Sequence, residues 1–415
     1  MASEESVRVL IADKLSETAV LALSKLGAAV EVRSELSEEE LPSAIGSSEV
    51  LIVRSTKVSA KAIEAGGNLS LIIRAGAGVN TIDLAAATRR GIHVANCPGK
   101  NSDAVAELAI GLMLAADRRI VDASTDLRDG RWRKKEYGKA AGLKGRTLGI
   151  VGLGSIGQAV AQIAHGLGMK VVGWSRSLTA ERAEEMGIGY SVDLLELADK
   201  ADAVSVHLAL APETKHLIAK PFFDAMKEGA IFVNTSRGEI VDTDALRSAI
   251  ESRHLRAAGD VFESEPSGGE AAFGDNELAT LLCASTPHIG ASTEQASEAI
   301  AREVVRIVRV YLETGKPPHS VNVREKSAAR TSLVVRHLNR VGVLASVLDE
   351  LKAAGINIEE MENTIFGGIP GSGEGGASAS DGVAASCTLR LDESPGPETV
   401  DRIRRMDNII QVSLK

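Results

Sequence analysis

The chain has 415 residues, of which 44% are hydrophobic and 25% charged, so the composition predicts a globular protein with two or three domains. The net charge of -9 argues against a nucleic-acid or acidic-membrane partner, and no apolar run reaches the roughly 18 residues of a membrane span. The acidic start MASEESVRVLIAD does not resemble a signal peptide, and the three cysteines are too scattered for a disulfide framework or a zinc site. We therefore expect a cytoplasmic protein without a bound metal.

Residues 6–99 alternate short β-branched runs with helical patterns. The runs VRVLIAD, AVEVR, VLIVR, LSLIIR and IHVAN are separated by segments such as SETAVLALSKLG. This alternation predicts βα units on a parallel sheet. A proline turn and a strand in KPPHSVNV indicate that residues 289–323 return to complete this lobe.

Residues 100–288 predict a second α/β lobe of the Rossmann-like or flavodoxin-like kind. A long helical stretch from Asn101 precedes the strand-like runs TLGIVG, KVVGW, AVSVHLA, AIFVNTS and AAGDVF. Residues 328–415 then follow the order strand, helix, strand, strand, helix, strand, which is typical of a ferredoxin-like domain. Within this tail, the Gly/Ser-rich residues 367–382 predict a flexible loop.

The motif Gly152-x-Gly154-x-x-Gly157 lies between the predicted strand TLGIV and a predicted helix. Glycines allow the backbone to approach a ligand closely, and the N-terminus of a helix offers free N–H groups and a positive dipole to a pyrophosphate. In this strand-turn-helix context, the motif predicts a dinucleotide site.

The end of the next predicted strand bears on which dinucleotide is bound. An Asp or Glu usually binds the ribose 2′-hydroxyl of NAD there, whereas this chain has Ser175 and Arg176. A hydroxyl and a guanidinium can bind the 2′-phosphate of NADP, which a carboxylate would repel. The pair favours NADP; the alternative is that Arg176 is a solvated side chain and that NAD binds without its usual acid.

Three polar clusters, VNTSRGEIVD, AAGDVFESEP and TPHIGAST, follow predicted strands of the second lobe, where open α/β sheets bind ligands. His288 is a candidate proton carrier, because histidine titrates near neutral pH. Glu265 is a candidate partner for its imidazole, and Arg237 is a candidate clamp for a substrate carboxylate. Asp260 is placed toward the nicotinamide end of a cofactor. Each residue also has a purely structural interpretation.

The segments RAGAGVNTIDLAAATRRGI, GLGSIG, NTSRGEIVD, DVFESEP and PHIGAST resemble, in this order, signatures of the D-isomer-specific 2-hydroxyacid dehydrogenases. The resemblance covers nearly the whole chain and implies that Arg237, Glu265 and His288 form the catalytic set. It also implies that residues 6–99 bind the substrate and residues 100–288 bind the dinucleotide. Beyond the three glycines, the cofactor positions that it implies are Ala77, Ser155, Ile156, Ser175, Arg176, His207, Leu208, Thr235, Ser236, Asp260, Gly290 and Ala291.

Members of this family act on several 2-hydroxy acids, so the catalytic set implies a reaction type without a substrate. Arg54, Ser55 and Asn101 resemble phosphate-binding positions of members that take a phosphorylated substrate, and the backbone of Ala77 and Gly78 resembles their carboxylate site. We therefore expect oxidation of 3-phospho-D-glycerate in L-serine biosynthesis, with reduction of glyoxylate or hydroxypyruvate as the alternative. Lys134 and Lys135 either add positive charge across the boundary of a homodimer or homotetramer or form a solvated basic face.

The tail VVRHLNRVGVLASVLDELKAAGINI resembles an ACT domain, a module that binds amino acids. His337, Asn339 and Asn357 match the positions that hold serine in serine-inhibited members of the family, which implies feedback inhibition by L-serine. A hypothesis of another class is a dinucleotide-sensing regulator, because relatives of this fold include corepressors. The intact Arg237, Glu265 and His288 set argues against that role.

Overall fold

A computed structural model of the chain describes residues 6–34, 36–266, 271–324, 329–366 and 383–415. The predicted flexible loop 367–382 lies outside these residues. The chain divides into two structural units, Met1–Asn322 and Val323–Lys415. No helix within the described ranges combines the length and the apolar character that a membrane crossing requires.

The first lobe is a parallel sheet with the strand order β2-β1-β3-β4-β5, which is the flavodoxin-like order. Side chains alternate across a strand, so Leu10 packs toward α2, α3 and α4, whereas Val9 and Ile11 pack toward α1 and α14. Its elements are β1 (Arg8–Ile11), α1 (Glu17–Lys25), β2 (Ala29–Val32), α2 (Leu41–Ile45), β3 (Val50–Val53), α3 (Ala60–Ala65), β4 (Leu71–Arg74), α4 (Leu84–Arg89), β5 (His93–Asn96) and α14 (Glu294–Thr314).

The segment after α14 returns to β5 in the first lobe. The side chain of Asn322 accepts a hydrogen bond of 2.8 Å from the N–H of Val94 and donates one of 2.8 Å to the carbonyl of Ile92. Ser320 also forms an isolated antiparallel bridge with Ala95. These contacts attach the late segment to the sheet formed by the first hundred residues.

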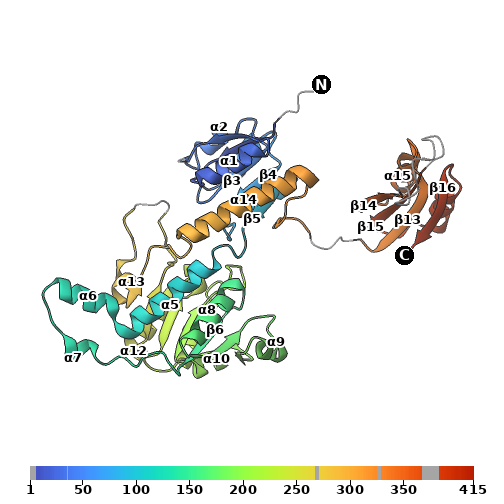
Figure 1. Cartoon of the computed structure of the whole chain (residues 1–415). Helices are drawn as coiled ribbons and strands as arrows, with labels where there is room; N and C mark the ends of the chain where they lie inside the picture. Colours follow the sequence, from blue (N-terminus) through green and yellow to red (C-terminus); the bar gives the residue numbers. More distant parts are fainter. Residues whose placement is uncertain (1–5, 35, 267–270, 325–328, 367–382) are drawn as a thin grey trace, which may run out of the picture. The chain divides into compact units, whose positions relative to one another are not determined.

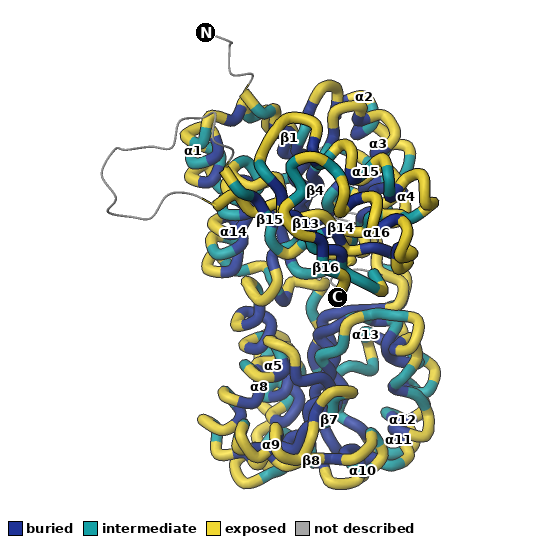
Figure 2. Tube along the Cα trace, turned by 90° about the vertical axis from the view of Figure 1, so that its right-hand side faces the viewer, coloured by how far each residue is buried: buried dark blue, intermediate teal, exposed yellow. Residues whose placement is uncertain are grey.

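The second lobe is a parallel sheet in the order β12-β11-β10-β9-β6-β7-β8, the Rossmann order. Helices α5 and α8 cover one face and α10 to α13 cover the other, so the central strands are buried on both faces (Figure 2). Its elements are α5 (Ser102–Arg118), β6 (Thr147–Val151), α8 (Ser155–Gly166), β7 (Lys170–Trp174), α9 (Ala180–Glu185), β8 (Gly189–Tyr190), α10 (Leu194–Lys200), β9 (Ala203–Val206), α11 (Lys220–Ala225), β10 (Ile231–Asn234), α12 (Thr243–Arg253), β11 (Arg256–Gly259), α13 (Asn276–Leu281) and β12 (Ala284–Ser285). Between α5 and β6, helices α6 (Ile120–Arg128) and α7 (Lys134–Tyr137) form an arm that extends from the lobe (Figure 1).

The unit Val323–Lys415 is an antiparallel sheet with the strand order β14-β15-β13-β16. Its core joins strand residues such as Leu333 and Leu389 to Val347 of α15 and Ile403 of α16. Its elements are β13 (Thr331–Leu338), α15 (Val343–Ala353), β14 (Ile358–Ile365), β15 (Ala384–Leu391), α16 (Pro397–Arg404) and β16 (Ile409–Leu414). The predicted fold class, two parallel-sheet lobes followed by a ferredoxin-like domain, is confirmed.

Candidate active site

The predicted glycine motif forms the turn between β6 and α8. Gly152 has φ +96°, and a Cβ atom there would lie 2.5 Å from the carbonyl oxygen of His207. A Cβ atom on Gly157 would lie 2.0 Å from the carbonyl oxygen of Gly152, so a side chain is excluded at both positions. No side chain caps the N-terminus of α8, which leaves its N–H groups available to a pyrophosphate. The turn, with Gly154, Ser155 and Ile156, therefore fits a dinucleotide.

Two further predicted cofactor residues present unpaired polar atoms near this turn. Nδ1 of His207 and Oγ1 of Thr235 are buried and have no hydrogen-bond partner among the described residues. Burial lowers the pKa of His207 to about 3, and its Nε2 lies 2.8 Å from Oγ of Ser205. The neutral ring is thus held at the carboxyl end of β9, with one nitrogen left for a ligand.

Ser175 and Arg176 directly follow β7. Ser175 is half-buried and Arg176 is exposed. The guanidinium of Arg176 makes neither a hydrogen bond nor an ion pair with any other described residue. It is therefore available to an anion at the end of this strand.

The three predicted catalytic residues converge from three separate loops that follow β10, β11 and β12. Nδ1 of His288 lies 2.6 Å from Oε2 of Glu265, and Oε1 of Glu265 accepts a hydrogen bond of 3.0 Å from the N–H of Phe262. Nη1 of Arg237 donates to the carbonyl of Ser236 over 2.6 Å. The bond at Nδ1 leaves Nε2 of His288 as the nitrogen that can exchange a proton with a substrate.

The electrostatics of the loop favour an ionised Glu265. Burial raises the pKa of this carboxyl. The hydrogen bonds from His288 and Phe262 and the positive charge of Arg237 lower the pKa by more than burial raises it, so it lies below its usual 4.5. Glu265 is therefore a carboxylate at neutral pH. It can stabilise a positive charge on the ring of His288.

A cavity joins this catalytic set to the first lobe. A Cβ atom on Gly78 would lie 2.6 Å from Nη2 of Arg237, so this glycine lets the guanidinium pack against the backbone that follows β4. The cavity therefore receives side chains from both lobes of the unit. Its described lining comprises Arg74, Gly78, Asn80, Thr81, Arg237, Glu239, Phe262, Glu263, Glu265 and His288.

Asp260 holds the turn that carries His288. Asp260 is 1% exposed. Its Oδ1 accepts hydrogen bonds from the hydroxyl of Thr286 (2.6 Å) and the N–H of Ile289 (2.8 Å). Its Oδ2 accepts a hydrogen bond from the N–H of Gly290 (2.8 Å). Its carbonyl accepts the N–H of His288 at 2.7 Å. His288 has φ +52°, an unfavourable conformation for this residue that the surrounding bonds hold in place. The predicted nicotinamide contact of Asp260 stays a prediction.

Asn234, at the end of β10, shapes the loop that carries Arg237. Its Oδ1 accepts bonds from the N–H of Ser236 (3.0 Å) and its hydroxyl (2.6 Å), and its Nδ2 donates to the carbonyl of Arg237 (2.9 Å). The sequence motifs predicted Ser236 and Arg237 as site residues but did not predict Asn234. A short polar side chain at the start of a turn was the available signal.

Arg74 was also missed. It ends β4, and its guanidinium packs so closely on Gly76 that a Cβ atom there would lie 1.5 Å from Nη1. Its Nε is buried and has no partner among the described residues. Burial lowers the pKa of Arg74, and the positive charges of Arg237 and Arg54 lower it further. The signal was an arginine at the carboxyl end of LSLIIR, the place that Arg54 has in VLIVR.

The predicted phosphate site is only partly free in the structure. The N–H groups of Arg54, Ser55 and Thr56 all donate to Oδ2 of Asp13, at 2.7, 3.1 and 3.0 Å. The side chains of Arg54 and Ser55 are therefore what remains for a ligand. Oδ1 of Asn101 is buried and unpaired among the described residues. The described lining of the catalytic cavity does not include Arg54, Ser55 or Asn101.

The remaining predicted positions lie in both lobes and in the C-terminal unit. Leu208 lies beside Gly152, Ala291 follows the Asp260-bound Gly290, and the carbonyl of Ala77 accepts a bond of 2.6 Å from Asn96. In the C-terminal unit, His337 is buried, with Nε2 at 3.3 Å from Oδ1 of Asn363. Asn339 and Asn357 are exposed.

Comparisons with known proteins agree with this fold and site. A family model described as "D-isomer specific 2-hydroxyacid dehydrogenase, NAD binding domain" matches residues 110–290. The chain is 42% identical to the hydroxypyruvate reductase of Thermotoga maritima over 289 residues, which are 69% of this chain and 92% of that protein. The chain belongs to the D-isomer-specific 2-hydroxyacid dehydrogenase family. The resemblance seen in the sequence motifs is thereby confirmed, and the second lobe is the family's NAD-binding domain.

The chain is also similar to D-3-phosphoglycerate dehydrogenases. The chain is 43% identical to the D-3-phosphoglycerate dehydrogenase of Methanocaldococcus jannaschii over 310 residues, 73% of this chain but only 58% of that protein. The NAD+-bound 3-phosphoglycerate dehydrogenase of Entamoeba histolytica has a similar solved structure, with a TM-score of 0.64 and 29% identity over 77% of this chain and 99% of that one.

Proposed function

We propose that this protein oxidises 3-phospho-D-glycerate to 3-phosphohydroxypyruvate in L-serine biosynthesis. The observation that carries the proposal is the pair of His288 and Glu265, 2.6 Å apart, at a cavity that also contains the guanidinium groups of Arg74 and Arg237. This combination supplies a proton acceptor and positive charge at one place. The similarity to D-3-phosphoglycerate dehydrogenases supports the choice of substrate.

In the proposed reaction, Nε2 of His288 accepts the proton of the C2 hydroxyl as the C2–H bond breaks and the C2=O bond forms. Glu265 stabilises the resulting imidazolium, and Arg237 binds the substrate carboxylate and orients C2. A bound NAD or NADP supplies the hydride acceptor, its nicotinamide ring. The residues of this chain thus orient the substrate and accept its proton.

The first lobe supports a phosphorylated substrate. Arg54 follows β3, and Arg74 is the last residue of the neighbouring strand β4. A phosphate carries close to two negative charges at neutral pH. Arg74 has an unpaired buried Nε, and the charge of Arg54 acts on it. We propose that these two guanidinium groups bind the phosphate.

The test is a spectrophotometric panel at 340 nm, a wavelength at which reduced nicotinamide absorbs, with 3-phosphoglycerate, 2-oxoglutarate, hydroxypyruvate and glyoxylate against both cofactors. We expect turnover of 3-phosphoglycerate that is lost in Arg54→Ala, while glyoxylate reduction is retained. The second candidate, a glyoxylate or hydroxypyruvate reductase, is favoured by the similarity to the Thermotoga maritima enzyme and predicts indifference to this substitution. Absence of hydride transfer with every 2-keto acid would favour a dinucleotide-sensing regulator.

For the cofactor we propose a preference for NADP over NAD. Ser175 and the unpaired, exposed Arg176 stand where a carboxylate would select NAD, and this supports binding of a 2′-phosphate. The test compares kcat/KM for NAD and NADP in the wild type and in Arg176→Ala. A strong wild-type preference for NAD contradicts the proposal.

We also propose a homodimer or homotetramer that associates through the arm of α6 and α7. Large apolar side chains are exposed on it, with Trp132 at 79% and Leu127 at 56% exposure, and such clusters indicate interaction surfaces. Lys134 and Lys135 on α7 would then add positive charge to the partner's substrate site. Sedimentation of Trp132→Glu tests this: the wild type is expected to be oligomeric, and an equally oligomeric variant argues against the arm.

Finally, we propose that the C-terminal unit is an ACT domain that binds L-serine through His337, Asn339 and Asn357 and thereby inhibits the enzyme. The ferredoxin-like strand order and the exposure of the two asparagines support this. Unchanged activity at millimolar L-serine would refute it. The cytoplasmic location expected from the sequence stays a prediction.

A further inference from the structure

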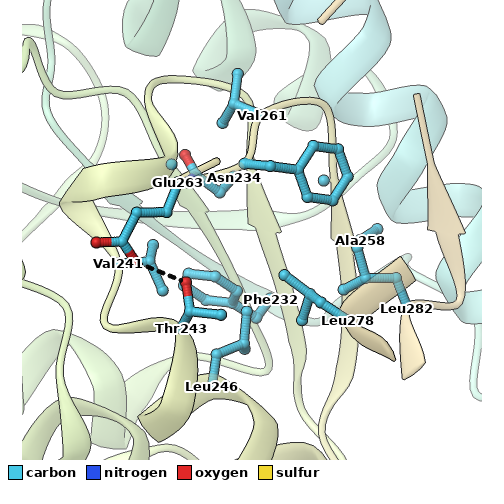
Figure 3. Close-up of a pocket in the computed structure, with 13 residues that line it drawn as sticks. Phe232, Asn234, Val241, Thr243, Leu246, Ala258, Val261, Glu263, Leu278 and Leu282 are labelled. Carbon is cyan, nitrogen blue, oxygen red and sulfur yellow. Dashed lines mark hydrogen bonds between the residues drawn. The ribbon is translucent and has the colours of Figure 1, made fainter. Parts of the chain in front are cut away.

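Two glutamates of the loop after β11, Glu263 and Glu265, each pair with an imidazole. Glu265 pairs with His288, as described above. Oε1 of Glu263 lies 2.9 Å from Nε2 of His216. Oε2 of Glu263 accepts a hydrogen bond of 3.1 Å from the hydroxyl of Thr243 (Figure 3). The proposed reaction uses only the first pair, so the second pair has no assigned role.

The segment of His216 is attached to the segment of Arg237. The N–H of His216 donates to the carbonyl of Glu239 over 2.8 Å, and the N–H of Ile218 donates to the carbonyl of Ile240 over 3.1 Å. Ile218 also forms a parallel bridge with Val241. The backbone of His216 therefore holds the residues that follow Arg237, while its ring holds the loop that contains Glu265.

The loops of Arg237 and Glu265 also touch each other directly. A Cβ atom on Gly238 would lie 2.0 Å from the carbonyl carbon of Phe262 and 2.3 Å from the N atom of Glu263. Because the two backbones are in van der Waals contact, a shift of Glu263 displaces both Arg237 and Glu265. The position of Glu263 is therefore coupled to two of the three catalytic residues.

The surroundings of Glu263 make its pairing important for substrate binding as well. It lines the catalytic cavity together with Glu239 and Glu265. On its other side it borders a pocket whose wall is mostly apolar, including Phe232, Val241 and Leu278 (Figure 3). Without His216, the carboxylate of Glu263 would keep only the hydroxyl of Thr243 as a partner and would present its charge to a cavity that receives anions, where like charges repel.

We propose that His216 and Glu263 are positioning residues of the active site. Together they fix the loops of Arg237 and Glu265 and satisfy the carboxylate of Glu263 at the wall of the substrate cavity. The proposal rests on the proposed dehydrogenase activity, because its effect is read from hydride transfer.

The test variant is His216→Asn in the full chain. Asparagine tolerates the left-handed backbone of His216 (φ +51°), but its side chain is too short to replace the imidazole at Glu263. His254→Asn is the matched control, because His254 is an exposed histidine of the same lobe with φ +56°. We expect kcat to fall between about tenfold and a hundredfold in His216→Asn, as small displacements of catalytic groups do, and to stay within about twofold in the control.

Two further measurements separate positioning from loss of structure. The dissociation constant of NADH, measured by fluorescence, is expected to be unchanged, because the bonds of His216 go to Glu239 and Glu263. His216→Asn is expected to raise KM for the anionic substrate, because the charge of Glu263 is then exposed to the cavity. In His216→Asn/Glu263→Gln that charge is absent, so KM is expected to return to its wild-type value while kcat stays low. Thr243→Val, which removes one hydroxyl from Glu263, gives a smaller loss of kcat and replaces His216→Asn if that variant does not fold.

The outcomes are distinguishable. An active wild type with equal kcat in His216→Asn and His254→Asn overturns the positioning role and leaves the proposed function intact. A loss of NADH binding in His216→Asn that parallels the loss of kcat also overturns it, because the defect is then general. A wild type without hydride transfer overturns both proposals.

Discussion

The hydroxyl of Thr286 donates a hydrogen bond of 2.6 Å to Oδ1 of Asp260. The carboxylate of Asp260 also accepts the N–H groups of Ile289 and Gly290, so its partners lie both before and after His288 in the sequence. The left-handed backbone of His288 is thus maintained by a buried acid rather than by local preference.

Replacing Asp260 with Asn is therefore expected to lower kcat by roughly a hundredfold. An amide group has only one acceptor oxygen, so one of the N–H groups loses its partner and the turn of His288 relaxes. Thr286→Val removes a single donor and is expected to cost about tenfold. The measurement is kcat at saturating substrate, with Thr314→Val as the control for loss of a hydroxyl. Wild-type kcat in Asp260→Asn would show that the turn is stable without the carboxylate.

The sequence predicted those parts of the site that depend on local patterns. Gly152 and Arg237 follow strand-like runs, and the carboxyl ends of parallel strands lie at one edge of a sheet. That rule placed the loops of Arg237, Glu265 and His288 at one edge, and the family resemblance implied that the three residues form a catalytic set. The alternation of strands and helices likewise predicted parallel sheets, although not the order of their strands.

The missed residues are those whose role depends on distant partners. Asp13 is 41 positions from Arg54, and Glu263 is 47 positions from His216, so no local pattern links them. Arg74 is the last residue of β4, and Arg54 is the first residue after β3. The unpaired Nε in the folded chain is what marks Arg74 as a ligand candidate. Such contacts are set by how the strands are arranged in space.

The hydrogen bonds that Asp13 accepts lead to a second prediction. Its carboxylate accepts three consecutive N–H groups, those of Arg54, Ser55 and Thr56. Asp13→Ala leaves them without this acceptor, and we expect a loss of about 1–3 kcal/mol in the free energy of unfolding. The released turn also moves Arg54, so KM for 3-phosphoglycerate is expected to rise while KM for glyoxylate stays constant. Denaturant unfolding and steady-state kinetics measure the two effects, and Asp13→Asn, which keeps one acceptor oxygen, is expected to be intermediate. Equal changes in KM for both substrates would contradict a local effect on Arg54.

The lowered pKa of Glu265 leads to a third prediction. Because the pKa of this carboxyl in the folded protein lies below 4.5, its contribution to stability is fully present above that pH and is lost only as the pH falls through the lower folded value. Acidification from pH 7 to pH 5 therefore leaves Glu265 ionised, so Glu265 keeps its negative charge beside the ring of His288 throughout this range.

Glu265→Gln tests this assignment. Glutamine has no negative charge to stabilise a protonated ring, so the height of the kcat/KM profile is expected to change. The plateau is expected to fall by roughly a hundredfold, because the imidazolium formed during oxidation loses its partner. The measurement is a pH profile of hydride transfer from 3-phosphoglycerate. A plateau that keeps its wild-type height in the variant would exclude Glu265 as the partner of the imidazolium.

Two glycines of the site are expected to respond differently to alanine. A Cβ atom on Gly238 would meet the backbone of Phe262 at 2.0 Å, whereas one on Gly78 would meet Nη2 of Arg237 at 2.6 Å. Backbone cannot yield without moving a loop, but the end of a long side chain can. Gly238→Ala should therefore lower both the melting temperature and kcat. Gly78→Ala should leave the melting temperature unchanged and raise KM for the hydroxy acid by about tenfold, because Arg237 is displaced from the substrate carboxylate.

Gly111→Ala is the control for these two substitutions. Gly111 lies within α5 with no atom in the way of a Cβ, so alanine there is expected to stabilise the protein by about 0.5–1 kcal/mol through helix propensity. Thermal unfolding and steady-state kinetics on the three variants give the comparison. If Gly78→Ala changes KM for the oxidised dinucleotide as strongly as KM for the hydroxy acid, the displaced group is not Arg237 alone, and the assignment of its guanidinium to the substrate carboxylate fails.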